Sequence, residues 1–232
     1  MLCLYLREKV ESCNSPAPIE SAVYAVRWVH EIAGISSPTE SSLVKQVLEA
    51  SMRLLGKLVQ GKQSLDLDVI TKVAEKFNTP QTCFIIIIFF AGLMRCDEII
   101  HVNKSHVSIF PDHMSSFCPK RKNDQRSQGH FFYFARSDKI TCPVSITEKL
   151  LSKLPDKPGQ PLVCRLSSKG TALQHSISYS GVREIFRETI SIFVKECNRF
   201  STHSLKKGGA AASGAAGIGM PAGNQTNLSI VI

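Results

Sequence analysis

Arg95 is the first residue of this sequence whose placement needs a chemical explanation. It directly follows Cys83–Met94, the most apolar segment of the chain. A guanidinium is a permanent cation and is almost never buried without a partner. Arg95 therefore needs an anion, which is either the neighbouring Asp97 or Glu98 or a ligand that arrives from outside.

A second group of cations lies in the polar segment Pro119–His130, PKRKNDQRSQGH, between two β-prone runs. Its basic residues are Lys120, Arg121, Lys122 and Arg126. A charged loop is most often only solvated, but two flanking strands would hold this one in a fixed direction. Lys and Arg number 28 against 19 for Asp and Glu, and this net charge of +9 favours a polyanionic partner.

The eight cysteines are spread along the chain, without a C-x-x-C pair, and several lie in apolar runs. This usage is typical of reduced thiols and predicts a nuclear or cytoplasmic protein. A zinc site could be assembled from Cys96, His101, His106 and Cys118, but their spacing matches no zinc pattern. We expect no metal and no cofactor. Because the apolar run is too short to cross a bilayer and no secretory signal is recognisable, we also expect no membrane association.

Residues 1–60 have the pattern of a helical domain. A helix is predicted over about 18–33, and a second one begins at Ser37 and Pro38, with Glu40 as the partner in a capping box. In the first helix, Trp28 and Val29 widen an apolar face that also holds Ile19, Val23, Val26 and His30. The second carries Lys45, Arg53 and Lys57, which either face a phosphate backbone or are ordinary surface cations.

The remainder follows a polar, glycine-bearing boundary at 56–64. Helices are predicted over 66–77, from 80 through the apolar run, over 147–154 and 178–194, and from 201 or 202 onward, where small residues allow close packing. Three β-prone runs, Val107–Phe110, Met114–Cys118 and Phe131–Ala135, predict an antiparallel sheet. The fold class is therefore mainly α with a small antiparallel β-sheet, that is, α+β.

Four motifs, taken together, resemble the tyrosine recombinase (phage integrase) superfamily, and most closely the integrase-like proteins of eukaryotic mobile elements. They are AGLMRCDEI, PKRKNDQRSQGH, TCPV and HSLKKGGA, and their order and spacing carry the resemblance. The segments PIESAVYAVRWVHEIAG and SPTESSLVKQVLEA resemble the helical core-binding domain of that group. The resemblance runs from about residue 4 to residue 218.

This resemblance implies a domain plan. Residues 1–60 correspond to a SAM-like core-binding domain, 61–65 to a linker and 66–219 to an incomplete catalytic domain, while 220–232 form a divergent tail. Proteins of the superfamily attack a DNA phosphodiester with a tyrosine hydroxyl and use no metal, so their own cations must neutralise the charge on the phosphate.

The resemblance also implies the site residues. Arg95, in an R-x-x-E arrangement that ends at Glu98, corresponds to the first catalytic arginine. Lys122 corresponds to the lysine that protonates the leaving 5′ oxygen, with Lys120 one position away, and His203 and Lys206 correspond to the H-x-x-R motif. The implied DNA contacts are Lys45, Arg53, Lys57, Lys120, Arg121 and Arg126.

The sequence departs from the family pattern at two places. Lys206 stands where an arginine belongs, and a lysine is a point charge without the planar fork of a guanidinium. Losing one positioned donor costs on the order of a hundred- to a thousandfold in rate. The family's tyrosine lies downstream of H-x-x-R, whereas the tyrosines here are Tyr5, Tyr24, Tyr133 and Tyr179. We interpret Tyr179 as a packing residue near a helix start.

These observations predict a double-stranded DNA-binding protein of the recombination and integration type that does not cleave DNA, in other words a pseudoenzyme. Two alternatives stay open. One is a helical interaction module without a DNA role, or a decayed fragment of a mobile element. The other is a partner of a full-length recombinase that supplies the tyrosine, or a self-associating chain.

Overall fold

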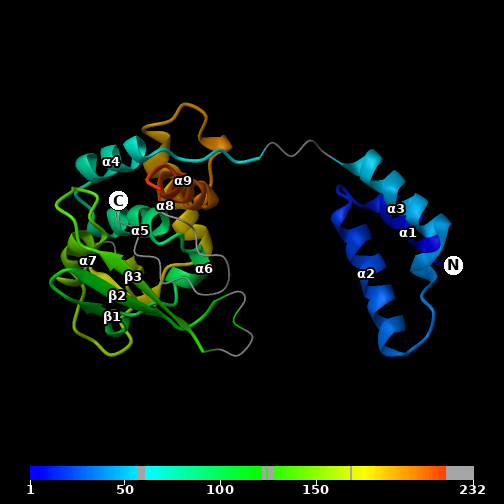
Figure 1. Cartoon of the computed structure of the whole chain (residues 1–232), viewed down its shortest axis with the longest axis horizontal. Coiled ribbons are helices and arrows are strands. Elements are labelled where there is room, and N and C mark those ends of the chain that lie inside the picture. The colour runs from blue at the N-terminus through cyan, green and yellow to red at the C-terminus, as the bar shows by residue number, and fades with distance from the viewer. Residues whose placement is uncertain (57–60, 122–123, 125–127, 168, 218–232) are drawn as a thin grey trace. The chain divides into compact units, whose positions relative to one another are not determined.

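The computed structural model describes residues 1–56, 61–121, 124, 128–167 and 169–217. The chain divides into two compact units, Met1–Gln60 and Gly61–Ile232. Both are described here separately (Figure 1). Helices dominate and the strands are short and antiparallel, so the predicted fold class is confirmed. Within the described ranges, no helix combines the length and the apolar character that a bilayer span requires.

The first unit consists of α1 (Leu2–Ser12), α2 (Ala17–Ile32), the 3₁₀ turn η1 (Pro38–Glu40) and α3 (Ser42–Leu55). Its small core is centred on Leu6, Ile19 and Val44, one from each α-helix. The prediction for Trp28 and Val29 is wrong, because their side chains are 62% and 55% exposed. Successive helical positions are rotated by about 100°, so Trp28 lies on the side of α2 opposite Ile19, whereas Val29 lies at an uncovered edge of the face that holds Ile19.

The start of α3 also differs from its prediction. Pro38–Glu40 forms the separate turn η1, and the extended backbone of Ser41 divides it from α3. The side chain of Ser37 does accept the N–H of Thr39. Glu40, however, forms ion pairs with Lys45 and Arg27 and completes no capping box, because the chain leaves the helical conformation directly after it.

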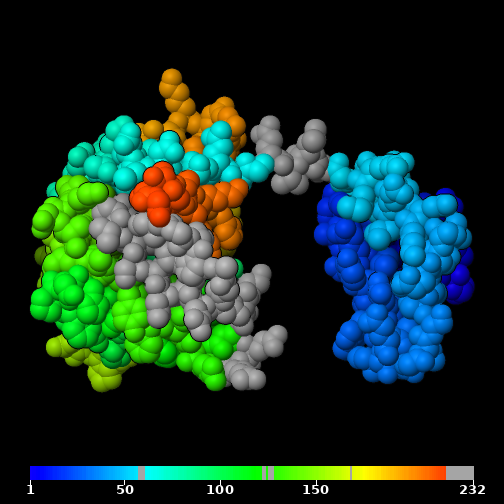
Figure 2. Space-filling model, in the orientation of Figure 1, coloured from blue at the N-terminus to red at the C-terminus, as the bar shows by residue number. Residues whose placement is uncertain are grey.

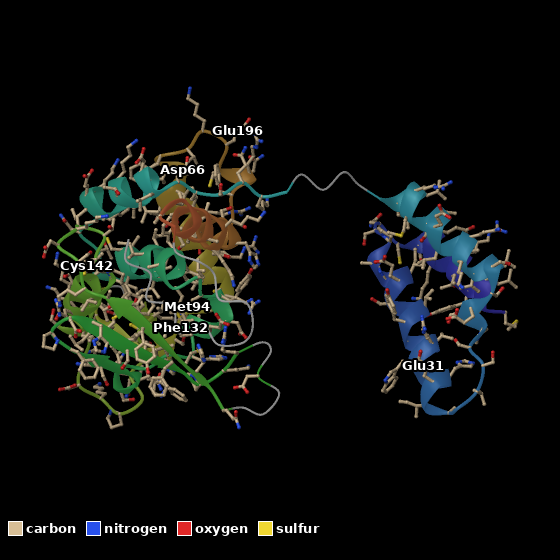
Figure 3. All side chains as sticks on the ribbon, in the orientation of Figure 1. Glu31, Asp66, Met94, Phe132, Cys142 and Glu196 are labelled. Atoms are coloured by element: carbon tan, nitrogen blue, oxygen red, sulfur yellow. The ribbon has the colours of Figure 1, made fainter. Side chains whose placement is uncertain are left out.

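The second unit is built around α5 (Pro80–Ala91), whose side chains from Cys83 to Ala91 are all buried. Figure 1 shows α5 in the middle of this unit, and it contacts α4 (Leu67–Lys76), α7 (Pro143–Leu151), α8 (Tyr179–Ser191) and α9 (Thr202–Ala215). Asp66, labelled in Figure 3, is the N-cap of α4. Helices surround α5 on several sides, so every face of it is buried. This explains why its sequence is apolar throughout and has no amphipathic periodicity.

The predicted three-stranded sheet is present. Its strands are β1 (Val107–Ile109), β2 (His113–Cys118) and β3 (His130–Ala135), in the order β1-β2-β3. The register pairs Cys118 with His130, so the Pro119–Gly129 segment connects the ends of two paired strands. Alternate residues of β2 and β3, including Met114 and Phe134, are buried toward the helices. The polar turn is thereby held at one end of the sheet, as predicted.

Two features of the second unit were not predicted. A hairpin of β4 (Cys164–Leu166) and β5 (Ala172–Ser176) lies between α7 and α8. Helix α7 begins at Pro143 rather than Thr147, since the Cys142 sulfur caps it by accepting the N–H of Ser145.

The short helix α6 (Cys96–Ile99) follows α5, and the 3₁₀ turns η2 (Lys104–His106) and η3 (Cys197–Arg199) complete the unit.

Residues 61–65, which the sequence analysis assigns to a linker, pack on the second unit. The backbone N–H of Gln63 donates to Arg199, and that of Leu65 donates to Ser204 of α9. The Leu65 side chain is buried in the core. In Figure 2 the surface of α4, in cyan, adjoins that of the C-terminal part of α9, in red-orange, and the two helices are in contact. The segment before α4 therefore packs against η3 and the first turn of α9.

Candidate functional site

Arg95 is positioned by the sharp turn between α5 and α6. Gly92 ends α5, Leu93 adopts a left-handed backbone with φ of 49°, and the buried Met94 leads to Arg95, which is the N-cap of α6. A Cβ on Gly92 would lie 2.8 Å from the Phe134 ring, so only glycine lets the turn approach the sheet this closely. The turn thus carries Arg95 from the apolar core to its edge.

Glu98 is the anion that Arg95 requires. Its Oε2 accepts the backbone N–H of Arg95 at 2.7 Å, and its Oε1 lies 3.5 Å from Arg95 Nη1. The Glu98 side chain is only 3% exposed. Asp97, the other candidate, is exposed and lies 3.9 Å from His101. The two contacts fix the position of Arg95, because a buried carboxylate without a partner would cost free energy.

Arg121 reaches the same carboxylate from the end of the β2–β3 connection. Its Nε donates to Glu98 Oε1 at 3.3 Å, and its guanidinium lies over the ring of Phe132 with 5.5 Å between the guanidinium carbon and the ring centroid. Phe132 is labelled on β3 in Figure 3. The sequence indicated Arg121 only as a general DNA contact. Arg121 and Glu98 are 23 residues apart in the sequence, and no local motif predicts their contact.

His203 and Lys206 come from the first two turns of α9. Ser201 caps this helix, its backbone N–H donating to Ser204 Oγ at 3.0 Å. Thr202, Ser204 and Leu205 are buried against the unit, which leaves His203 exposed and Lys206 partly exposed. Because residues three apart lie on one face of a helix, both side chains project on the same side.

The pKa of Lys206 is lowered by its surroundings. Burial lowers this pKa most, and the positive charges of Arg95 and Arg121 lower it further, while the negative charge of Glu98 acts in the opposite direction. Lys206 is therefore close enough to both guanidiniums to feel their charge. Two guanidiniums, Arg95 at the start of α6 and Arg121 in the β2–β3 connection, pair with the buried Glu98, and the charge of Lys206 from α9 is added to theirs.

A pocket of about 210 Å³ opens beside this cluster. Arg95 and His203 line it together, as do Asp97 and Tyr179, and its remaining walls are Phe89, Met94, Cys96 and Thr202. Tyr179 lies at the start of α8, as predicted, and its 49% exposed side chain lines the pocket. Arg183 lies over its ring. The structure thus brings Arg95, His203 and Lys206 together and adds Arg121 and Tyr179.

The other predicted site residues are distributed as follows. Lys120 is exposed next to Arg121. Lys45 and Arg53 lie exposed on α3 of the first unit, where they pair with Glu40 and Glu49. Lys57, Lys122 and Arg126 lie outside the described residues. Their assignments stay predictions.

The thiols near the site have ordinary partners. The Cys118 thiol donates to the carbonyl of Lys120 at 3.2 Å, and burial raises the pKa of Cys118 and of Cys96 to about 11. Both are therefore neutral thiols at neutral pH. In the ranges that the structure describes, no group of three or more His, Cys, Asp or Glu side chains is arranged to hold a metal ion.

Comparison with known proteins gives one relative by sequence. The integrase/recombinase XerD homolog of Selenomonas ruminantium is 21% identical over 204 residues, which are 84% of this chain and 60% of that protein. The chain thus spans less than two thirds of the length of this relative. No protein-family model matches the sequence.

Solved structures share the fold. The integrase of the transposon Tn1549, in complex with circular intermediate DNA, matches with a TM-score of 0.58 at 10% identity, over 94% of this chain and 72% of that one. A lambda integrase dimer bound to a COC′ core site matches with a TM-score of 0.50 at 13% identity, over 91% and 71%. XerA recombinase also gives 0.50 at 13% identity, over 92% and 76%.

The chain has the fold of the tyrosine recombinases. The solved structures show this fold, and the sequence relative agrees with the resemblance that the motifs carry. A particular closeness to the integrase-like proteins of eukaryotic mobile elements stays a prediction.

Proposed function

We propose that this chain binds double-stranded DNA in the manner of a tyrosine recombinase and holds a backbone phosphate between Arg95, His203 and Lys206. The observation that supports this most is that Arg95 and Arg121 pair with the same buried carboxylate, Glu98, while the charge of Lys206 acts on the same group. One carboxylate cannot neutralise Arg95, Arg121 and Lys206, so the cluster keeps an excess of positive charge beside an open pocket. A phosphate diester supplies the missing negative charge and accepts several N–H donors at once.

We further propose that a polypeptide of this sequence does not cleave the bound strand. Its last tyrosine is Tyr179, and the segment after His203 contains none. Without a nucleophile in that position, the phosphate would be bound and polarised but not attacked. Lys206 would also hold it less rigidly than an arginine, because an ammonium cannot grip two oxygens in one plane.

A salt titration tests the binding. Fluorescence anisotropy of a labelled duplex of generic sequence would compare the native chain, Arg95→Ala and the control Arg165→Ala, which removes an exposed arginine of β4. The logarithm of affinity falls linearly with the logarithm of salt concentration, and each lost phosphate contact flattens the slope by about 1. We expect this flattening, with roughly tenfold or greater weakening, for Arg95→Ala only. Equal behaviour of the two variants contradicts the site.

Cleavage is tested with a nicked duplex that traps covalent intermediates of tyrosine recombinases. After denaturation, we expect no labelled DNA attached to the protein, at protein concentrations that saturate binding. A covalent product would contradict the proposed lack of cleavage. If it disappears in Tyr179→Phe, the attacking hydroxyl is that of Tyr179.

One observation favours the alternative of an interaction module. On α2, Tyr24, Trp28 and Ile32 follow each other at intervals of four residues and are all exposed. Such an apolar row suits a protein partner, either another copy of this chain or a full-length recombinase. Sedimentation with and without Trp28→Ser separates the cases, since self-association through α2 would be weakened in the variant.

A further inference from the structure

We infer that Arg121 supplies the second guanidinium of the phosphate site, taking over the role for which the H-x-x-R position here offers only Lys206. This rests on the proposed function and names a phosphate-gripping residue that lies outside the motif.

The contacts of Arg121 hold its guanidinium in place and leave most of its donors available. Nε donates to Glu98 Oε1, and the face of the group lies on Phe132. Among the described contacts, this is the one hydrogen bond of the Arg121 side chain. A guanidinium has five N–H donors in a rigid plane, and the Nη atoms of Arg121 form a hydrogen bond with no described residue, so their N–H groups can bind a ligand.

Glu98 gives Arg121 and Arg95 a shared orientation. Oε1 lies 3.5 Å from Arg95 Nη1 and 3.3 Å from Arg121 Nε, so the two guanidiniums meet at one oxygen. Arg121 is 28% exposed, a partial burial that suits a group fixed at the edge of a binding site. Two planar cations anchored to one buried carboxylate form a preorganised clamp for an anion that carries several oxygens.

Lys206 faces the same space. Its pKa is lowered first by burial and then by the charges of Arg95 and Arg121. A lysine there contributes charge, but its single nitrogen cannot form two parallel bonds to a phosphate. Arg121 can form them, because its Nη atoms are not engaged by Glu98. The departure from the motif at Lys206 is in this way offset by a residue from the β2–β3 connection.

The test compares arginines and lysines at two positions by duplex binding. Arg121→Ala should weaken binding about tenfold or more, and Arg121→Lys, which keeps the charge, should restore little of it. The control Lys120→Ala removes an exposed charge from the adjacent residue and should cost about threefold or less. In the Arg121→Ala background, Lys206→Arg should recover most of the lost affinity, since it puts a planar group back at the site.

Thermal melting of each variant establishes that it folds, and Arg121→Lys provides a variant that can still contact Glu98. The inference is overturned if Arg121→Ala and Lys120→Ala bind equally, if Arg121→Lys binds like the native chain, or if Lys206→Arg rescues nothing. In each of these cases the native chain binds DNA and the proposed function stands. A native chain that binds no duplex at low salt overturns both.

Discussion

Gly209 of α9 lies directly against the backbone of Phe90 in α5. A Cβ placed on Gly209 would lie 2.0 Å from the Phe90 carbonyl oxygen, which is too close for a carbon and an oxygen atom that are not bonded to each other. Gly209 follows Lys206 by three residues, and Phe90 precedes Arg95 by five. This contact between α5 and α9 therefore sets the spacing between Lys206 on α9 and Arg95, which follows the end of α5.

Gly209→Ala should lower the free energy of unfolding by about 1–3 kcal/mol or more, because the helices must move apart to admit the methyl group. Gly214→Ala is the matched control in the same helix, since a Cβ there meets nothing within 4 Å. Its stability should be unchanged or raised by up to about 1 kcal/mol. Urea denaturation of both variants measures the difference. Equal stability of the two would show that α9 does not pack on α5 this closely.

Removing the charge of Glu98 should also cost stability. Glu98→Gln leaves Arg95 and Arg121 without a shared anion in a buried position, and we expect a loss of about 1–3 kcal/mol. Glu49→Gln removes the partner of Arg53 on the exposed surface of α3 and should change stability by no more than about 0.5 kcal/mol. Chemical denaturation compares the two. A loss in Glu98→Gln no larger than in the control would mean that Glu98 does not organise the site.

Much of the fold was accessible to sequence reasoning because its signals are local. The buried α5 follows from an apolar run with a proline in its first turn, and β2 and β3 follow from β-prone runs on both sides of a polar turn. The hairpin of β4 and β5 was missed. Its strands are short and largely exposed, so they lack the alternation that marks a half-buried strand, and the turn glycine Gly170, with φ of 76°, was the one available signal.

The candidate site shows the opposite balance. Glu98 was one of the two neighbouring anions that the sequence offered for Arg95, since it lies three residues further on at the start of a helix. The contact between Arg121 and Glu98 joins two segments that only the tertiary fold brings together, and composition alone could not select Arg121 from the other cations of its turn. Exposure of Trp28 was missed for a related reason, since a broad apolar stripe does not reveal which of its edges is covered.

The buried thiols should resist alkylation. Burial raises the pKa of Cys96 and Cys118 to about 11, whereas Cys3 and Cys197 are only partly buried, so that the reagent can reach their thiols. At pH 8, mass spectrometry after brief iodoacetamide treatment should find Cys3 and Cys197 modified first. In urea all should react. Modification of Cys96 as fast as Cys197 in the folded protein would contradict its burial.

These thiols also predict how stability depends on alkaline pH. A thiol pKa that is higher in the folded state than the ordinary value of 9.0 means that the folded chain holds the proton longer. The stabilisation is complete below pH 9 and is lost as the pH rises through about 11. Cys96→Ala should make the decline shallower, as followed by denaturant titrations across this range. If stability declines with pH in Cys96→Ala and in Cys118→Ala as it does in the native chain, the decline is caused by other groups.

Duplex binding should weaken as the pH rises through the lowered pKa of Lys206. In the free protein, burial and the neighbouring guanidiniums favour the neutral amine, while a bound phosphate favours the ammonium. Binding therefore raises the pKa of Lys206. The affinity for the duplex is highest at pH values below the pKa that Lys206 has in the free protein, and it falls as the pH rises above that pKa. In Lys206→Arg the dependence should disappear, because a guanidinium stays protonated throughout.

Lys207→Arg is the matched control for this dependence. Lys207 is the next residue of α9, is exposed, and donates to the carbonyl of Lys62 at 2.9 Å. The same substitution there should leave the decline of affinity with pH as it is in the native chain. Anisotropy titrations from pH 7 upward at constant ionic strength, limited to the range in which each variant stays folded, provide the comparison. A decline that persists in Lys206→Arg would mean that this lysine does not contact the phosphate.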